Sequence, residues 1–179
     1  MMLIINICRE KLHYLEFVKP IEDILKSLNI PFRTMHYEEL DKKEISRADK
    51  VIICGTSLAD NDFLKHLDCF SWIKGFKKPI LGICGGMHIL GIVFNGRLKK
   101  AKEIGITPIV FKKSFLGLSG EKLVYALHSL FVSSSQFDTY AVSKNCSQAI
   151  KHKTLPFYGV LFHPEVRVHS LITAFCTEV

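Results

Sequence analysis

The fold is decided by Pro79-Ile80-Leu81-Gly82-Ile83-Cys84-Gly85-Gly86-Met87-His88-Ile89-Leu90, near the middle of the chain. Residues 79–83 are apolar and predict a short buried strand, and residues 85–90 predict the start of a helix. Cys84 then lies at a sharp turn from strand to helix, which is the nucleophile-elbow geometry with cysteine in place of serine. A glycine two residues to either side fits this prediction, because such a turn leaves little room for side chains.

A second motif lies about eighty residues further on, where a predicted strand over residues 158–162 ends at His163-Pro164-Glu165. A histidine can act as the base of a cysteine nucleophile, and a carboxylate can orient that histidine. We therefore predict Cys84 as nucleophile, His163 as its base and Glu165 as the group that holds His163. Each motif alone also fits a structural turn without chemistry. The two together, each at the end of an apolar strand, favour a cysteine-nucleophile enzyme.

The flanking segments predict an α/β fold. Strands are expected over residues 3–8, 32–37 and 51–54, and helices over residues 15–28, 41–48 and 64–76. This alternation indicates a three-layer sandwich, with a central mostly parallel sheet and helices on both faces. Past Gly96, short strands are expected over residues 104–111, 122–127, 139–142, 149–152 and 158–162. They predict a small antiparallel addition and a return to the main sheet, closed by a helix over residues 169–177. One domain over residues 1–179 is expected.

Composition narrows the class of protein. The net charge of +7 comes with lysine clusters, but no nucleic-acid-binding motif or interleaved aromatic platform accompanies them. We therefore expect no nucleic-acid partner. The short apolar start, residues 1–7, favours neither a signal peptide nor a membrane span, so a cytoplasmic protein is predicted. Six cysteines lie without a CxxC pair or metal-type spacing. They are expected to be reduced thiols, and no metal site is predicted.

The predicted elbow also suggests where an oxyanion would be stabilised. The backbone N–H of Gly85 follows the nucleophile, the usual position of one donor. The loop Gly55-Thr56-Ser57 follows the third strand and reaches the same edge of a parallel sheet, so it is the candidate for a second donor. His128 follows another predicted strand. It is either a structural histidine at the strand end or a pocket residue.

The order and separation of the two motifs resemble those of the class I glutamine amidotransferases, which have a flavodoxin-like fold and a Cys-His-Glu triad. The resemblance covers the whole chain. Within the family, residues 145–166, which end in Phe162-His163-Pro164-Glu165-Val166, look most like the glutaminase subunit of archaeal GMP synthase.

This resemblance implies that Cys84 attacks the side-chain amide of glutamine, giving a glutamyl thioester and ammonia. His163 would protonate the ammonia and later activate water, while Glu165 holds it. The resemblance makes Thr56 and Gly85 the oxyanion donors, and Gly55, His88 and His128 the candidate substrate-binding residues. Ammonia would pass to a separate synthetase subunit of the ATP-pyrophosphatase type, which for GMP synthase acts on XMP. This chain would need no cofactor, because ATP and Mg²⁺ belong to that partner.

Three positions depart from the family pattern. The family usually has glutamine where this chain has His88, and a donating glycine where it has Thr56. The Ser-His-x-Asp of GMP-synthase glutaminases corresponds here to Leu127-His128-Ser129-Leu130, which keeps the histidine and lacks the acid. Two alternatives therefore stay open. One is a relative that acts on another γ-glutamyl amide or a peptide, and the other is a non-catalytic regulatory subunit that keeps the fold.

Overall fold

The computed structural model describes residues 1–179, which build one sheet of nine strands. Five neighbouring strands are parallel, in the order β2 (Phe32–His36), β1 (Met2–Asn6), β3 (Lys50–Ile53), β4 (Ile80–Ile83) and β9 (Phe157–Val160). The sheet continues through antiparallel pairs, in the order β8 (Ser147–His152), β7 (Phe137–Val142), β5 (Arg97–Phe115) and β6 (Leu118–Ser133). The predicted parallel core, the antiparallel addition and the return to the main sheet are confirmed.

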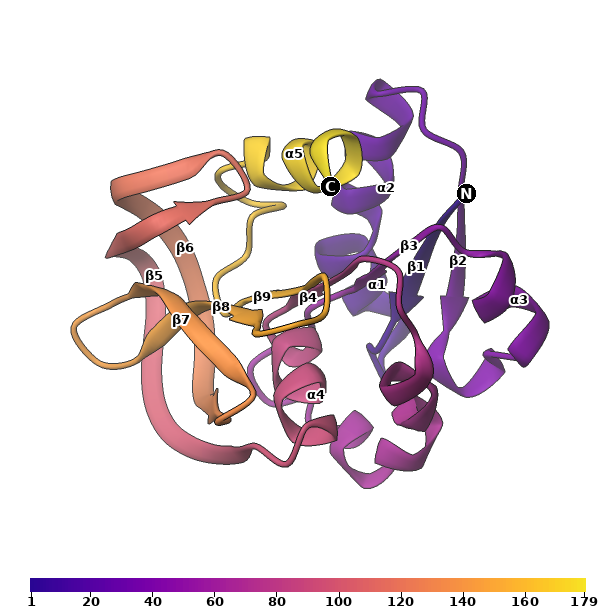
Figure 1. Ribbon diagram of the computed structural model, residues 1–179, viewed down its shortest axis with the longest axis horizontal. Coiled ribbons are helices and arrows are strands. Elements are labelled where there is room, and N and C mark those ends of the chain that lie inside the picture. The colour runs from indigo at the N-terminus through magenta and orange to yellow at the C-terminus, as the bar shows by residue number, and fades with distance from the viewer.

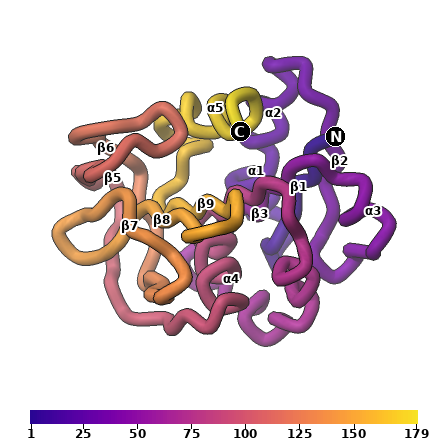
Figure 2. Tube along the Cα trace, in the orientation of Figure 1, coloured from indigo at the N-terminus to yellow at the C-terminus, as the bar shows by residue number.

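Helices cover both faces of the parallel strands, as predicted (Figure 1). One hydrophobic cluster joins the sheet to α1 (Lys11–Phe17), α2 (Lys19–Ser27) and α5 (Ser170–Glu178). The other joins the opposite face to α4 (Gly85–Val93) and the 3₁₀ helices η2 (Asp62–Lys65) and η3 (Leu67–Gly75). α3 (Lys42–Arg47) lies beside the edge strand β2, and η1 (Tyr37–Glu39) packs on η3. Figure 2 shows that α5, the last helix of the chain, packs on α2 near the start of the chain.

Two predicted helices differ from the observed ones. The helix expected over residues 15–28 is two helices that meet at Val18, because Pro20 lacks an N–H and its ring crowds the preceding turn. The segment expected as a helix over residues 64–76 is 3₁₀ rather than α. Its buried residues Phe70, Ile73 and Phe76 are three apart, which suits the three residues per turn of a 3₁₀ helix.

The antiparallel addition is built from longer strands than expected. The short strands predicted over residues 104–111 and 122–127 are parts of β5 and β6, which have 19 and 16 residues. Register shifts between Lys100 and Glu103 and between Phe111 and Phe115 interrupt the pairing of these two strands. The lysine-rich ends of β5 are exposed, so they lack the apolar alternation by which a strand is recognised in a sequence.

Candidate active site

Cys84 occupies the turn between β4 and α4. Its backbone has φ 48° and ψ −102°, a conformation that non-glycine residues rarely adopt, and the residue caps the N-terminus of α4. The turn is tight on both sides. A Cβ added to Gly82 would lie 2.5 Å from the backbone of Gly86, and one added to Gly86 would lie 2.3 Å from the carbonyl oxygen of Ile53. The strand-to-helix elbow predicted from the sequence is therefore present.

His163 and Glu165 lie just past the carboxyl end of β9. The His163 backbone N–H donates to the carbonyl of Tyr125 on β6, at 2.8 Å, which fixes the segment against the antiparallel strands. His163 Nδ1–H donates to Glu165 Oε1 at 2.7 Å, and neither side chain is exposed to solvent. The Phe17 ring packs on the imidazole, with ring centroids 5.2 Å apart. Both residues are therefore held by neighbours on different elements.

The charge of the imidazole follows from these neighbours. Burial lowers the pKa of His163, but the Glu165 carboxylate and the Cys84 sulfur outweigh burial and raise that pKa well above its ordinary value. His163 is therefore an imidazolium at neutral pH. The N-terminus of α4 lies at the same turn, because Cys84 is the residue that precedes the helix.

Gly55 lies in the gap between the two candidate catalytic side chains. A Cβ at this position would lie 2.6 Å from His163 Cε1 and 3.4 Å from Cys84 Cβ. Any larger residue would push the imidazole away from the sulfur. The structure thus gives Gly55 a steric role in bringing Cys84 and His163 together, and a contact with substrate stays a prediction.

The two predicted oxyanion donors lie at the same edge of the sheet. Gly85 is the first residue of α4, so its N–H has no partner within the helix. Thr56 follows β3 and is buried, and its backbone does not adopt a positive φ. Its side chain therefore brings no left-handed strain. Thr56 Oγ1 donates to Asp60 Oδ2 at 2.7 Å, and the Arg9 N–H donates to the same oxygen at 2.8 Å.

His88 faces the cavity from the first turns of α4. Its Nε2 lies 3.2 Å from the Leu130 carbonyl oxygen, which requires a proton on Nε2, and its buried Nδ1 has no partner. Burial lowers the pKa of His88 to about 4, so the ring is neutral at physiological pH. A neutral ring with Nε2–H leaves Nδ1 as a hydrogen-bond acceptor.

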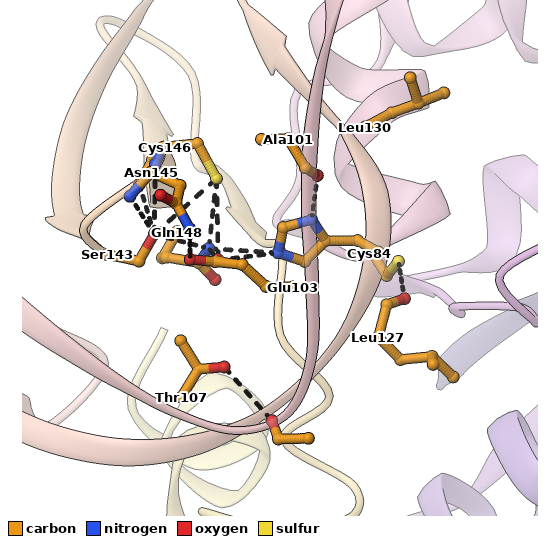
Figure 3. Close-up of polar contacts among 12 residues, drawn as sticks. Cys84, Ala101, Glu103, Thr107, Leu127, Leu130, Ser143, Asn145, Cys146 and Gln148 are labelled. Carbon is orange, nitrogen blue, oxygen red and sulfur yellow. Dashed lines mark hydrogen bonds and ion pairs between the residues drawn. The ribbon is translucent and has the colours of Figure 1, made fainter.

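His128 lines the same cavity, but its ring nitrogens bond elsewhere. Nδ1 lies 3.1 Å from the Ala101 carbonyl oxygen, and Nε2 lies 3.1 Å from Glu103 Oε2 on β5. The acid that the segment after His128 lacks is thus supplied by the neighbouring strand. A direct contact of the imidazole with substrate stays a prediction. The carbonyl oxygen of Leu127, the residue before His128, lies 3.7 Å from Cys84 Sγ (Figure 3).

The cavity beside Cys84 is bounded by the loop after β3, the start of α4 and residues 127–130 of β6. All of the predicted site residues except Gly55, His163 and Glu165 line it. Sequence reasoning missed Asp60, which ties down the loop of Thr56, and Glu103, which bonds to His128. Neither residue lies in a recognisable motif. Asp60 is 4 residues from Thr56 in the sequence, and Glu103 is 25 residues from His128. No helix of the structure is long and apolar enough to span a bilayer.

Comparison with known proteins agrees with the site. The family model "Glutamine amidotransferase class-I" matches residues 13–174. The chain is 31% identical over 160 residues to a glutamine-hydrolyzing GMP synthase subunit of Methanococcus aeolicus, covering 84% of each chain. It is 29% identical over 170 residues to anthranilate synthase component 2 of Saccharolobus solfataricus, covering 86% of this chain and 87% of the relative.

A solved structure is also similar. The crystal structure of a putative GMP synthase subunit from Thermoplasma acidophilum superimposes with a TM-score of 0.83 at 23% identity, covering 99% of this chain and 94% of that one. This likeness supports the fold. The two named relatives belong to enzymes with different acceptors, so sequence similarity alone does not separate the acceptors.

Proposed function

Since the chain belongs to the class I glutamine amidotransferase family, we propose that it hydrolyses the side-chain amide of glutamine to glutamate and ammonia. The observation that carries this proposal is the placement of Cys84 on a strained elbow beside a buried His163–Glu165 pair. A cysteine nucleophile, a base and a group that orients the base are the parts that acyl transfer through a thioester needs.

The reaction starts when the Cys84 thiolate attacks the amide carbon of glutamine. The N–H groups of Gly85 and Thr56 donate to the oxyanion that forms on the amide oxygen. The carbon–nitrogen bond then breaks, and His163 transfers its Nε2 proton to the departing nitrogen, which leaves as ammonia. Water next loses a proton to His163 and attacks the thioester. The carbon–sulfur bond breaks, glutamate leaves and the thiolate is restored.

We further propose that the ammonia passes to a separate synthetase subunit, and that the acceptor is XMP activated with ATP and Mg²⁺ on that partner. Similarity over most of both chains to a glutamine-hydrolyzing GMP synthase subunit supports this choice, as does the segment ending in Phe162-His163-Pro164-Glu165-Val166. The similar anthranilate synthase component 2 makes an anthranilate synthase partner the competing candidate.

The test is glutamate release by this chain mixed with the GMP synthase ATP-pyrophosphatase subunit of the same organism, with ATP, Mg²⁺ and XMP. The Cys84→Ala variant is the blank. We expect release above the blank that rises at least about tenfold when XMP and ATP are added, because closure on the partner completes such sites. Release that responds only to an anthranilate synthase partner would reassign the acceptor. No release with either partner would support the regulatory alternative.

The alternative substrate class is tested at His88. His88→Gln removes the neutral ring and its bond to Leu130. If the pocket is built for glutamine, we expect kcat/KM for glutamine to change by less than about tenfold, because a tenfold change corresponds to roughly the free energy of one hydrogen bond. Steady-state glutamate release measures this, with the partly exposed His66→Gln, outside the cavity, as the control substitution. A gain well above tenfold would show that the natural pocket serves a different γ-glutamyl amide.

A further inference from the structure

A second group of polar side chains gathers away from the elbow. Glu103 on β5, His128 on β6 and Gln148 on β8 meet Cys146, which precedes β8. All four are buried, and Glu103, His128, Gln148 and Cys146 have exposures of 8%, 2%, 0% and 9% in that order. In Figure 3, Glu103, Cys146 and Gln148 converge on one point, apart from Cys84 and Leu127. The proposed glutamine chemistry uses none of Glu103, Cys146 and Gln148.

The spacing of these atoms is close to that of a metal coordination shell. Glu103 Oε2 lies 3.1 Å from His128 Nε2 and 3.9 Å from Cys146 Sγ, and the three atoms all lie within 4.8 Å of one another. In a tetrahedral zinc site, bonds of about 2.0 to 2.3 Å place the ligand atoms roughly 3.3 to 3.8 Å apart. Little movement is needed to close this set around an ion.

Gln148 occupies the fourth corner. Its amide nitrogen lies 2.6 Å from Glu103 Oε2, 3.3 Å from His128 Nε2 and 3.4 Å from Cys146 Sγ. Its Oε1 is fully buried and has no hydrogen-bond partner. A turn of the amide about its last torsion exchanges the two atoms and brings Oε1 toward the same three side chains. The unpartnered oxygen would then have a cation to bind.

The remaining contacts orient the ligands. The Ala101 carbonyl can only accept a hydrogen bond, so the contact requires a proton on His128 Nδ1. This bond directs Nε2 toward Glu103. Nε2 and the carboxylate oxygen lie 3.1 Å apart. Asn145 Nδ2 donates to the other carboxylate oxygen of Glu103 at 2.9 Å. Such outer contacts are typical of metal ligands.

We propose that Glu103, His128 and Cys146 bind one divalent transition ion, with Gln148 Oε1 as the fourth ligand. A thiolate, an imidazole and carboxylate or amide oxygens in a closed tetrahedral set favour zinc. The ion ties β5, β6 and β8 together. Because β6 also carries the Leu127 carbonyl that contacts Cys84 and His128 lines the cavity, the metal site fixes one wall of the cavity.

The test is a titration with Co²⁺, whose thiolate charge-transfer absorption reports a cysteine ligand directly. Cys84 lies beside His163 and could bind cobalt itself, so the full chain is used with Cys84→Ala. We expect an absorption that saturates at one cobalt per chain and disappears on addition of Zn²⁺. Adding Cys146→Ser should abolish it, whereas adding Cys69→Ser, at the partly exposed cysteine of η3, should leave it unchanged.

Two results would overturn the proposal. One is a folded Cys84→Ala protein that shows no thiolate–cobalt absorption at millimolar Co²⁺, which would leave the cluster as an ion pair between His128 and Glu103. The other is absorption that persists in the Cys146→Ser protein. Far-ultraviolet circular dichroism checks folding. Glu103→Gln, which keeps the side-chain shape, should weaken cobalt binding at least about tenfold, and an unchanged affinity would also contradict the assignment.

Discussion

Replacing Cys84 with alanine is expected to reduce glutamate release from glutamine by at least about 10⁴-fold, because losing the nucleophile of a triad removes most of its rate enhancement and leaves only what the oxyanion donors and substrate binding supply. The Cys84 sulfur is one of the groups that raise the pKa of His163, and alanine offers no group to attack the amide carbon. Glutamine binding should persist, since alanine removes only the sulfur of Cys84 and leaves the other lining residues in place. Glutamate release in steady state and glutamine binding by calorimetry measure the two effects.

Two matched variants make this result specific. Cys84→Ser keeps the shape of the elbow and should also lose nearly all activity, because a neutral hydroxyl is a much weaker nucleophile than a thiolate. Cys69→Ala removes a thiol from η3, outside the cavity, and should retain full activity. Residual activity in Cys84→Ala within tenfold of the wild type would mean that the elbow cysteine is not the nucleophile.

The features that could be predicted from the sequence are those in which local pattern and chemistry coincide. The apolar strand before Cys84 and the glycines around it specify the elbow within five residues, because both strand burial and the tight turn depend on neighbours in the chain. The His163–Glu165 bond is equally local, since the partners are two residues apart. Such elements carry their own signal, and the structure shows each of them.

Prediction failed where contacts between distant segments decide the structure. The charged start of β5, Arg97 to Lys100, is a strand because it pairs with residues 130–133 of β6, and nothing in its own pattern indicates it. The break at Val18 carried a local signal in Pro20, and the expected helix over residues 15–28 did not allow for it.

The polar cluster of Glu103, His128 and Cys146 shows the same limit for function. Its members come from positions 103, 128 and 146, and the sheet alone brings them together. The sequence predicts no metal site because ligand pairs at helical or turn spacing are absent from it. A set assembled from neighbouring antiparallel strands has no fixed spacing. The same is true of Asp60, whose bond to Thr56 is visible only once the loop is folded.

The departures at Thr56 and His128 look different once the structure is considered. Thr56 keeps its backbone N–H at the sheet edge without a left-handed conformation, and Asp60 anchors its hydroxyl. The acid absent after His128 is present at Glu103. Neither departure removes a group that the proposed chemistry needs, so these two positions give little support to the non-catalytic alternative.

A second large effect is expected from Glu165→Gln, which keeps a hydrogen-bond acceptor for His163 Nδ1–H but removes the charge. We expect kcat for glutamate release to fall by about 10² to 10⁴-fold, as when the acid of a serine-protease triad becomes an amide. KM should change little, because Glu165 does not line the cavity. The control is Glu44→Gln, at another buried glutamate. Glu44 Oε1 lies 3.0 Å from the Arg33 guanidinium, and this pair lies far from the elbow. This substitution should lower stability without changing kcat.

The pH behaviour of Glu165→Gln separates an electrostatic role from a purely steric one. Burial lowers the pKa of His163, and the Glu165 carboxylate is the largest of the influences that raise it. Removing the carboxylate must therefore shift that pKa downward. A folded-state pKa above the unfolded value stabilises the protein below the pKa of an unfolded histidine, and this contribution disappears as pH rises through the folded value. The stability of the wild type should thus exceed that of the variant most at acidic and neutral pH.

Imidazole nitrogen shifts measured by NMR should show His163 protonated across neutral pH in the wild type and titrating at lower pH in Glu165→Gln. An unchanged midpoint, or an unchanged kcat, would show that Glu165 does not hold the charge of His163.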